Sequence, residues 1–159
     1  MKLFFLFLFF VITSFSASAQ YKPEAMVLPI TFVNFKDTAL QDSLNNFTQT
    51  ELSRNFEIKN EDEVAEAMDK ARDEMDSENC SEEACIKKMG GMLDVDYTFK
   101  LKIIDTGQVW DLIAIRIDYS ENPTMRRTEL CNDCSLTKAR KLISAMLSTM
   151  GTGEVSLKG

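Results

Sequence analysis

Short apolar runs alternate with stretches of helical periodicity in the first part of the chain. Residues 25–32 are almost continuously apolar, which is typical of a strand buried on both faces of a sheet. Pro29 lacks an amide hydrogen and therefore predicts a break or a bulge in the ladder. A helix is predicted over residues 38–55, because Thr38 opens a capping-box pattern and apolar residues then recur at helical spacing. Residues 56–60 predict a second short strand.

Two further helices are predicted between residues 61 and 94. Residues 61–79 carry a narrow apolar stripe on an otherwise charged segment, as in a surface helix packed on a sheet. The stripe consists of Val64, Met68, Ala71 and Met75. Ser81 is the predicted N-cap of the next helix, since acidic residues follow it in the first turn. That helix is expected to end near Asp94.

The last third alternates between apolar and polar positions with period two and then returns to helical spacing. Two strands joined by a turn at residues 105–108 predict a hairpin with one buried face. The predicted buried positions are Val95, Tyr97, Phe99, Leu101 and Ile103, followed by Ile113, Ile115, Ile117 and Tyr119. The polar residues 124–130 predict an edge strand, and residues 135–150 predict an amphipathic helix.

The order of these elements, β-α-β-α-α-β-β-β-α, predicts an α/β fold. We expect a single-domain sandwich in which helices pack on a mixed β-sheet. This domain would span residues 20–150, and residues 151–159 would form a flexible C-terminal tail.

The first nineteen residues have the features of a signal peptide. One lysine precedes an apolar run of about ten residues, which is too short to span a membrane, since a spanning helix needs roughly 20. Small residues ending at Ala19 predict cleavage there, so residues 1–19 would be removed. No cysteine follows the run to accept a lipid. We therefore expect a periplasmic or secreted protein with no stable membrane insertion after cleavage.

Composition narrows the classes of function. The formal net charge is −7, and an acidic surface argues against nucleic acid as a partner, because phosphate binding needs a basic face. The chain contains no histidine, which removes the commonest general base and the commonest metal ligand. We therefore predict a protein that is not an enzyme, with no catalytic residues, no cofactor and no metal.

Four stretches resemble the TolB N-terminal, CsgG and LpoB-like family of envelope modules. They are "VLPITFVNFKD", "FEIKNEDEVAEAM", "CSEEACIKKMGGMLDVDYTFKLKI" and "VWDLIAIRID", in the family's order, and the likeness covers residues 26–150. The resemblance implies an α/β fold without catalytic residues. It also implies action through protein contacts, within secretion, peptidoglycan-synthesis or envelope-integrity assemblies.

The cysteines form two tight pairs, Cys80 with Cys85 and Cys131 with Cys134. An exported chain meets an oxidising compartment, so two local disulfides that fix the starts of helices are the leading interpretation. Crossed pairing and an all-thiolate zinc site remain open alternatives. A third alternative is thiol–disulfide chemistry at Cys131 and Cys134, although Glu129 and Asp133 would raise a thiol pKa there.

Trp110 is the only tryptophan and shares a strand face with Leu112 and Ala114. Helices covering this face would place Trp110 in the core, whereas an open face would make it an anchor for a partner. The leading functional prediction is a non-enzymatic, exported interaction module that binds another cell-envelope protein. The alternatives are a thiol–disulfide oxidoreductase-like protein and a passive binder of a small ligand or metal.

Overall fold

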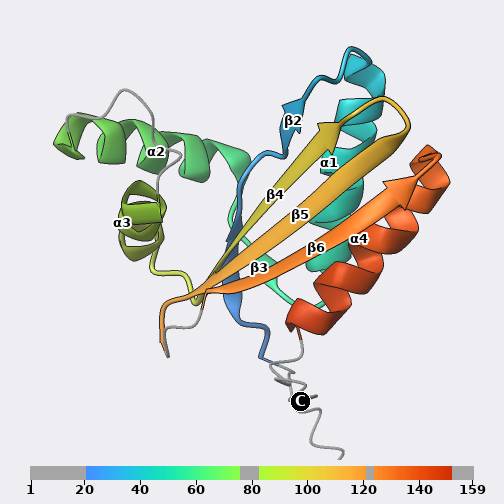
Figure 1. Ribbon diagram of the computed structural model, residues 1–159. Coiled ribbons are helices and arrows are strands. Elements are labelled where there is room, and N and C mark those ends of the chain that lie inside the picture. The colour runs from blue at the N-terminus through green and yellow to red at the C-terminus, as the bar shows by residue number, and fades with distance from the viewer. Residues whose placement is uncertain (1–20, 76–82, 121–123, 152–159) are drawn as a thin grey trace, which may run out of the picture.

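The computed structural model describes residues 21–75, 83–120 and 124–151 (Figure 1). They form a single α/β domain with a mixed sheet and packed helices, which confirms the predicted fold class. The strands are β1 Glu24–Val27, β2 Thr31–Val33, β3 Glu57–Ile58, β4 Tyr97–Asp105, β5 Val109–Asp118 and β6 Met125–Asn132. The helices are α1 Thr38–Leu52, α2 Glu61–Met75, α3 Glu83–Leu93 and α4 Leu136–Gly151.

The sheet has the strand order β3-β1-β4-β5-β6, with β2 pairing β4 beyond the end of β1. The pairs made by β1 and β2 are parallel, and the β4–β5–β6 pairs are antiparallel. The single strand predicted over residues 25–32 is therefore two strands. Val27 pairs with Phe99 and Thr31 with Lys102, so three residues around Pro29 oppose two on β4. This is the predicted break at Pro29, and it has the form of a bulge.

Local hydrogen bonds determine where two helices begin. The N-cap of α1 is Asp37, whose carboxylate accepts from the backbone N–H of Leu40 at 3.0 Å, so the prediction of Thr38 at this position was off by one residue. At the start of α2, Asn60 accepts from the N–H of Glu63 at 2.8 Å. The Glu63 carboxylate accepts from the Asn60 N–H at 3.2 Å, which completes a capping box. This box turns the chain into α2 directly after β3 and limits that strand to two residues.

The main hydrophobic core lies between the sheet and the helices α1 and α4, which lie behind it in Figure 1. Phe99, Leu101 and Ile103 of β4 contribute the face that the sequence predicted as buried. In β5 the prediction holds for Ile117, which is buried in the core formed with α2 and α3. It was wrong for Ile113 and Ile115, because Trp110, Leu112 and Ala114 are the residues buried against α1 and α4. Neighbouring residues across an antiparallel pair share a face, and Leu101 pairs with Ala114 and Ile103 with Leu112. The register between β4 and β5 therefore determines which face of β5 is buried against α1 and α4, and the period-two pattern does not reveal this register.

A smaller core packs α2 and α3 against one end of the sheet. It contains Met26, Leu28, Val64, Ala67, Ala71, Cys85, Ile86, Met89, Val95 and Ile117. Tyr119 joins it through its hydroxyl group, which donates to the carbonyl of Ile86 at 3.0 Å and lies 2.8 Å from the hydroxyl of Thr98. Burial raises the pKa of Tyr119 above its ordinary value, and the hydrogen bond with Thr98 opposes this effect. A Cβ atom at Gly90 would lie 2.0 Å from the Tyr119 hydroxyl oxygen, so glycine is required for this approach.

Both ends of the described chain lie at the same end of the molecule (Figure 1). The carbonyl of Pro23 accepts from the N–H of Glu57, and Gly151 lies beside Asn55 and Phe56. Buried Arg116 donates a hydrogen bond to the carbonyl of Met150 near the end of α4 and stacks over the Tyr97 ring at 5.1 Å. A cation is favourable at a helix C-terminus, so Arg116 holds the end of α4 against the sheet.

Within the described ranges, no helix combines the length and the apolar character that crossing a bilayer requires. The predicted signal peptide, residues 1–19, lies outside the described residues, as do residues 152–159 of the predicted tail. The boundaries of these two segments remain predictions.

Candidate functional site

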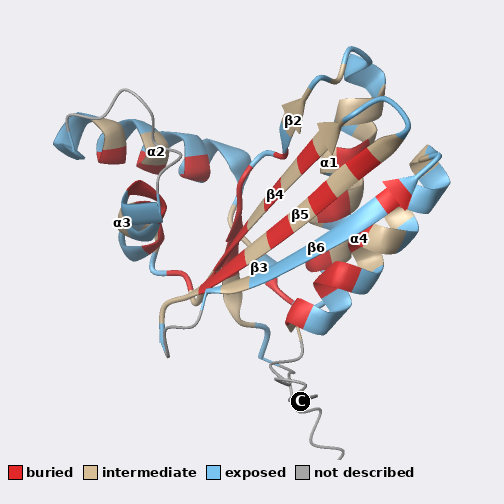
Figure 2. Ribbon diagram, viewed as in Figure 1, coloured by how far each residue is buried: buried red, intermediate tan, exposed pale blue. Residues whose placement is uncertain are grey.

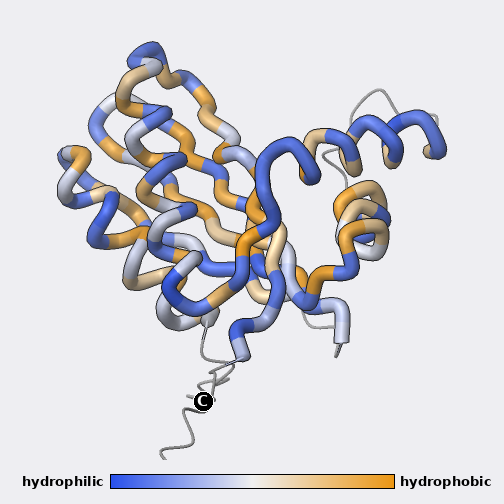
Figure 3. Tube along the Cα trace, turned by 180° about the vertical axis from the view of Figure 1, so that it is seen from behind, coloured by the Kyte–Doolittle hydropathy of each residue, from blue (hydrophilic) through white to orange (hydrophobic). Residues whose placement is uncertain are grey.

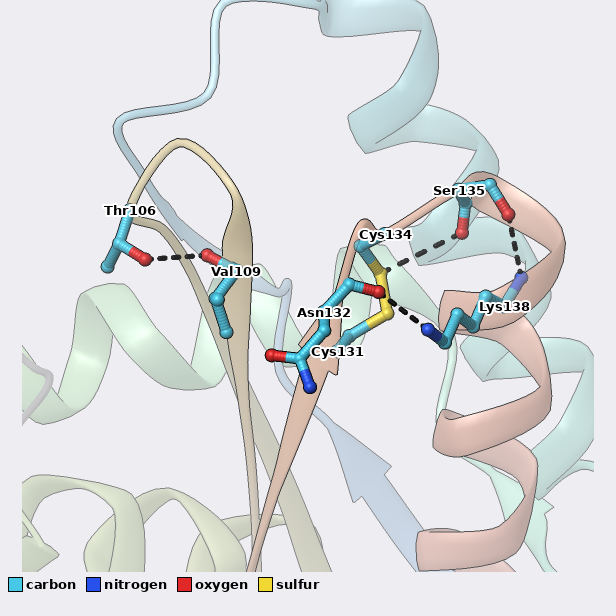
Figure 4. Close-up of a disulfide and its surroundings, with 7 residues drawn as sticks. All are labelled: Thr106, Val109, Cys131, Asn132, Cys134, Ser135 and Lys138. Carbon is cyan, nitrogen blue, oxygen red and sulfur yellow. Dashed lines mark hydrogen bonds between the residues drawn. A yellow bond between two sulfur atoms is a disulfide. The ribbon is translucent and has the colours of Figure 1, made fainter.

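The Cys131–Cys134 disulfide joins the end of β6 to the start of α4 (Figure 4). Cys131 is fully buried, while the Cys134 side chain is half-exposed. Asp133 between them adopts a φ of 45°, which allows the chain to reverse within four residues. The ammonium of Lys138 donates to the carbonyl of Asn132 at 2.5 Å and closes the same turn from the helix side. The bridge thus fixes how α4 leaves the sheet, as expected for a local staple.

The other predicted bridge involves Cys80, which lies outside the described residues. Cys85 is buried in the first turn of α3 and is disulfide-bonded. The pairing of Cys80 with Cys85 therefore stays a prediction.

Trp110 is only 9% exposed and belongs to the main core. Its ring makes an edge-on contact with Phe35, with 4.8 Å between the ring centroids. It pairs across the sheet with Cys131, so the disulfide lies next to it. Trp110 is therefore a core residue, as expected if helices cover its strand face, and the alternative role as a partner contact stays a prediction.

One face of the sheet has little helical cover over β4, β5 and β6, since α2 and α3 pack only at its end (Figure 1). The cross-strand register places Ile113 and Ile115 of β5 on this face, where both are half-exposed. Other residues on the same face are Lys100, Lys102, Ile104, Asp111, Arg126, Thr128 and Leu130. Edge strand β6 is exposed along most of its length, and Leu130 is 61% exposed (Figure 2). We call this surface the open sheet face; it combines apolar and cationic side chains.

A groove of about 670 Å³ lies between α1 and α2 at the end of β1. This volume falls within the range of about 300–1,000 Å³ typical of ligand pockets. Helix α1 contributes a polar wall of Asp42, Asn45, Asn46 and Gln49. Helix α2 contributes Glu61, Val64, Ala65 and Met68, and the residues Val27, Pro29 and Lys59 complete the lining. We call this the α1–α2 groove.

Hydrogen bonds hold the walls of the α1–α2 groove in place. The Asn45 amide oxygen accepts from the N–H of Ile30 at 2.9 Å, which ties α1 to the bulge after β1. The Gln49 amide donates to the Glu61 carboxylate at 2.8 Å and links the two helices at one end. Lys59 forms an ion pair with Glu24, and this hydrogen bond raises the pKa of Lys59 above its ordinary value. The groove is therefore preformed and does not depend on a ligand to bring its walls together.

Within the described ranges, no group of three or more histidine, cysteine, aspartate or glutamate side chains is arranged to hold a metal ion.

The α1–α2 groove was not predicted from the sequence, although the spacing of Asn60 and Glu63 was a usable signal. That capping-box spacing predicts the early end of β3 and hence the space beside β1.

The fold places the chain in the class of small mixed α/β modules with helices on both sides of one sheet. No protein-family model and no curated protein matches it. The LpoB C-terminal domain from Salmonella enterica matches with a TM-score of 0.51 and 6% identity, over 72% of this chain and 87% of that domain. Lipoprotein GNA1162 from Neisseria meningitidis matches with a TM-score of 0.52 and 13% identity, over 86% of this chain and 99% of that protein. At these identities the structural likeness shows a shared fold. It agrees with the resemblance of the sequence to LpoB-like modules. It does not support the resemblance to TolB and CsgG.

Proposed function

We propose that this chain is an exported, non-enzymatic interaction module that binds another protein of the bacterial cell envelope. The observation that carries the proposal is the open sheet face. A sheet in this class of fold ordinarily buries both faces. Here α2 and α3 reach only the end of this face, where Ile115 packs against their core, and both Ile113 and Ile115 stay half-exposed. An apolar surface of this kind, rimmed by polar residues, is typical of a protein interaction site.

Charge indicates what kind of partner fits the open sheet face. The chain as a whole is acidic, with a formal net charge of −7, whereas Lys102 and Arg126 make this face locally cationic. Helix α2 differs from the apolar centre of the open sheet face, because it is mainly hydrophilic along its length (Figure 3). A partner surface with acidic residues around an apolar centre would complement the open sheet face.

Two further observations support export and an envelope location. The N-terminal residues have the sequence of a cleavable signal peptide, and one structure of the same fold is that of a lipoprotein. The mature protein would begin at Gln20 and carry no lipid. Intact-mass measurement on the exported protein tests this directly, and recovery of a chain that retains Met1 would contradict it.

Site-specific cross-linking in cells tests the interaction. A photoreactive amino acid at Thr128 on the open sheet face is expected to form a cross-link to one envelope protein. The same amino acid at Ser148, which is exposed on α4 away from this face, serves as the control. If the two positions give the same pattern of products, the open sheet face is not a binding surface.

A further inference from the structure

Building on the proposed interaction role, we propose that the α1–α2 groove is a second binding surface, which takes up an extended segment of a partner protein. The bound segment would add a strand to the sheet beside β1. It would carry a lysine or arginine between apolar residues.

The first argument comes from the sheet edge. Pairing between β1 and β3 ends at Ala25 with Ile58, because the capping box at Asn60 turns the chain away. In a parallel ladder, alternate residues direct their N–H and C=O groups to opposite neighbours. The N–H of Leu28 donates to β4, whereas the carbonyl of Ala25 accepts from the N–H of Lys59 on the β3 side. By this alternation the N–H and C=O groups of Val27 point to the β3 side of β1, at a position beyond the last paired residue of β3. An edge of this kind is a template for strand addition.

The second argument comes from the position of the groove relative to the two sheet faces. Val27 belongs to the main core on the α1 side, whereas Leu28 and Val64 belong to the smaller core on the α2 side. The α1–α2 groove therefore continues the plane of the sheet and has a helix on each side. A strand placed there would find cover for both of its faces, which a strand at an open edge lacks. Pro29 has no N–H to offer, so pairing would end there and the added strand would be short.

The third argument concerns the sequence of the bound segment. Successive side chains of a strand point to opposite faces, so they would meet the two walls in alternation. The α2 wall offers Val64, Ala65 and Met68, which fit apolar side chains. The α1 wall offers the carboxylate of Asp42 among three amide side chains, which fits a lysine or arginine. The ammonium of Lys59 is paired with Glu24, so the remaining charge of the lining is negative.

Peptide binding to the full mature protein tests the proposal. The probe is a fluorescein-labelled heptapeptide, Ser-Val-Lys-Val-Lys-Val-Ser, with a blocked C-terminus, and binding is measured by fluorescence anisotropy. Replacing its lysines with glutamates is expected to weaken binding about tenfold or more, because it removes the charge pair. Methylating the backbone nitrogens of the central valine and of the lysine after it should have a similar effect, because neighbouring N–H groups point to opposite sides and one of the two must face β1. Equal binding by the N-methylated peptide would overturn strand addition.

Two protein variants, each with a matched control variant, locate the site. Ala65→Trp fills the α1–α2 groove from an exposed position on α2 and is expected to abolish binding, while Ala84→Trp, on the exposed side of α3, is the matched control. Asp42→Asn is expected to weaken binding of the lysine peptide, whereas Asp73→Asn removes the same charge outside the groove and should not. Binding that survives Ala65→Trp would place the peptide elsewhere and overturn the proposal.

Amide hydrogen exchange gives a readout that bulk affinity does not. The N–H of Val27 is expected to exchange at least about tenfold more slowly when the lysine peptide is bound, because a ladder bond protects it. Unchanged exchange at Val27 with a bound peptide would overturn the strand geometry. Self-association that is lost in Ala65→Trp would instead identify a second copy of this chain as the occupant and would overturn the partner-segment proposal.

The outcomes separate this inference from the proposed function. If the Thr128 cross-link forms in cells and Ala65→Trp has no effect on peptide binding, the interaction role stands and the groove proposal fails. If the peptide binds as described and no envelope protein cross-links to the chain, the groove proposal stands and the proposed function fails.

Discussion

Replacing Gly90 by alanine should have a large effect on stability for a reason that the sequence does not show. Gly90 lies inside α3, where glycine normally weakens a helix. The added Cβ would lie 2.0 Å from the hydroxyl oxygen and 2.1 Å from the adjoining ring carbon of Tyr119, distances at which atoms must move. The Tyr119 ring is held by hydrogen bonds to Thr98 and Ile86, so it can move only by giving up these bonds.

The magnitude follows from three opposing contributions to the free energy of unfolding. Alanine is favoured over glycine in a helix by about 1 kcal/mol. Overpacking a core costs about 1–3 kcal/mol. Loss of the two Tyr119 hydrogen bonds costs about 0.5–1.5 kcal/mol each. We therefore expect Gly90→Ala to lower the free energy of unfolding by about 3 kcal/mol, within a range of about 1–5.

Gly91 offers a matched control, because it is the next residue in the same helix and a Cβ there meets no atom within 4 Å. Gly91→Ala should raise stability by about 0.5–1 kcal/mol. Urea unfolding can be followed through the fluorescence of Trp110, the only tryptophan, which is buried in the folded state. If the two variants have the same unfolding midpoint, the contact between Gly90 and Tyr119 does not constrain the fold as described.

Three further changes test other parts of the structure. Arg116→Ala should lower the free energy of unfolding by about 2–4 kcal/mol, because it removes a charged hydrogen bond to Met150 and a cation–π contact with Tyr97. Urea unfolding measures this change. An effect below about 1 kcal/mol would contradict the anchoring role of Arg116. Replacing Cys131 and Cys134 together by serine should lower the free energy of unfolding by about 2 kcal/mol, since the bridge closes a short loop. The chain should still fold, with a melting temperature lower by about 5–10 °C. A chain that fails to fold would refute the view that the core comes from the sheet and helices. Burial raises the pKa of Tyr119, so its contribution to stability is fully present below about pH 10 and is lost as the pH rises above that value, where the unfolded chain releases the proton first. Stability measured between pH 8 and 11 should therefore fall less steeply in Tyr119→Phe than in the unchanged chain, and identical slopes would contradict the burial of this phenol.

The fold class could be predicted because most elements are encoded locally. Helix α4 has apolar residues at regular helical spacing, and the buried members Ala139, Ile143 and Met150 lie on that stripe. Pro29 predicted the break between β1 and β2 because its missing N–H is a property of the residue alone. Edge strand β6 could be recognised from its polar sequence.

What could not be predicted depends on contacts between elements far apart in sequence. The buried face of β5 was assigned to Ile113 and Ile115, since both faces of this strand are apolar and only pairing with β4 distinguishes them. The α1–α2 groove depends on β3 ending after two residues and on two helices meeting from opposite sides of the sheet. Cysteine spacing favoured local bridges, and the structure shows this for Cys131 and Cys134, where the turn at Asp133 brings them together.

The neighbouring ends of the described chain have a practical consequence for handling the protein. Pro23 and Gly151 both contact the segment that follows α1, while Pro29 and the α1–α2 groove lie beyond the opposite end of β1. Attachment points at either end of the described chain therefore lie away from the groove, and immobilisation there should leave the groove open to a soluble partner. Ends that lie close together also suit circular permutation. Joining them and opening the chain at the exposed turn at Gly107 would give a permuted protein whose groove is unchanged and whose new ends lie at the tip of the β4–β5 hairpin.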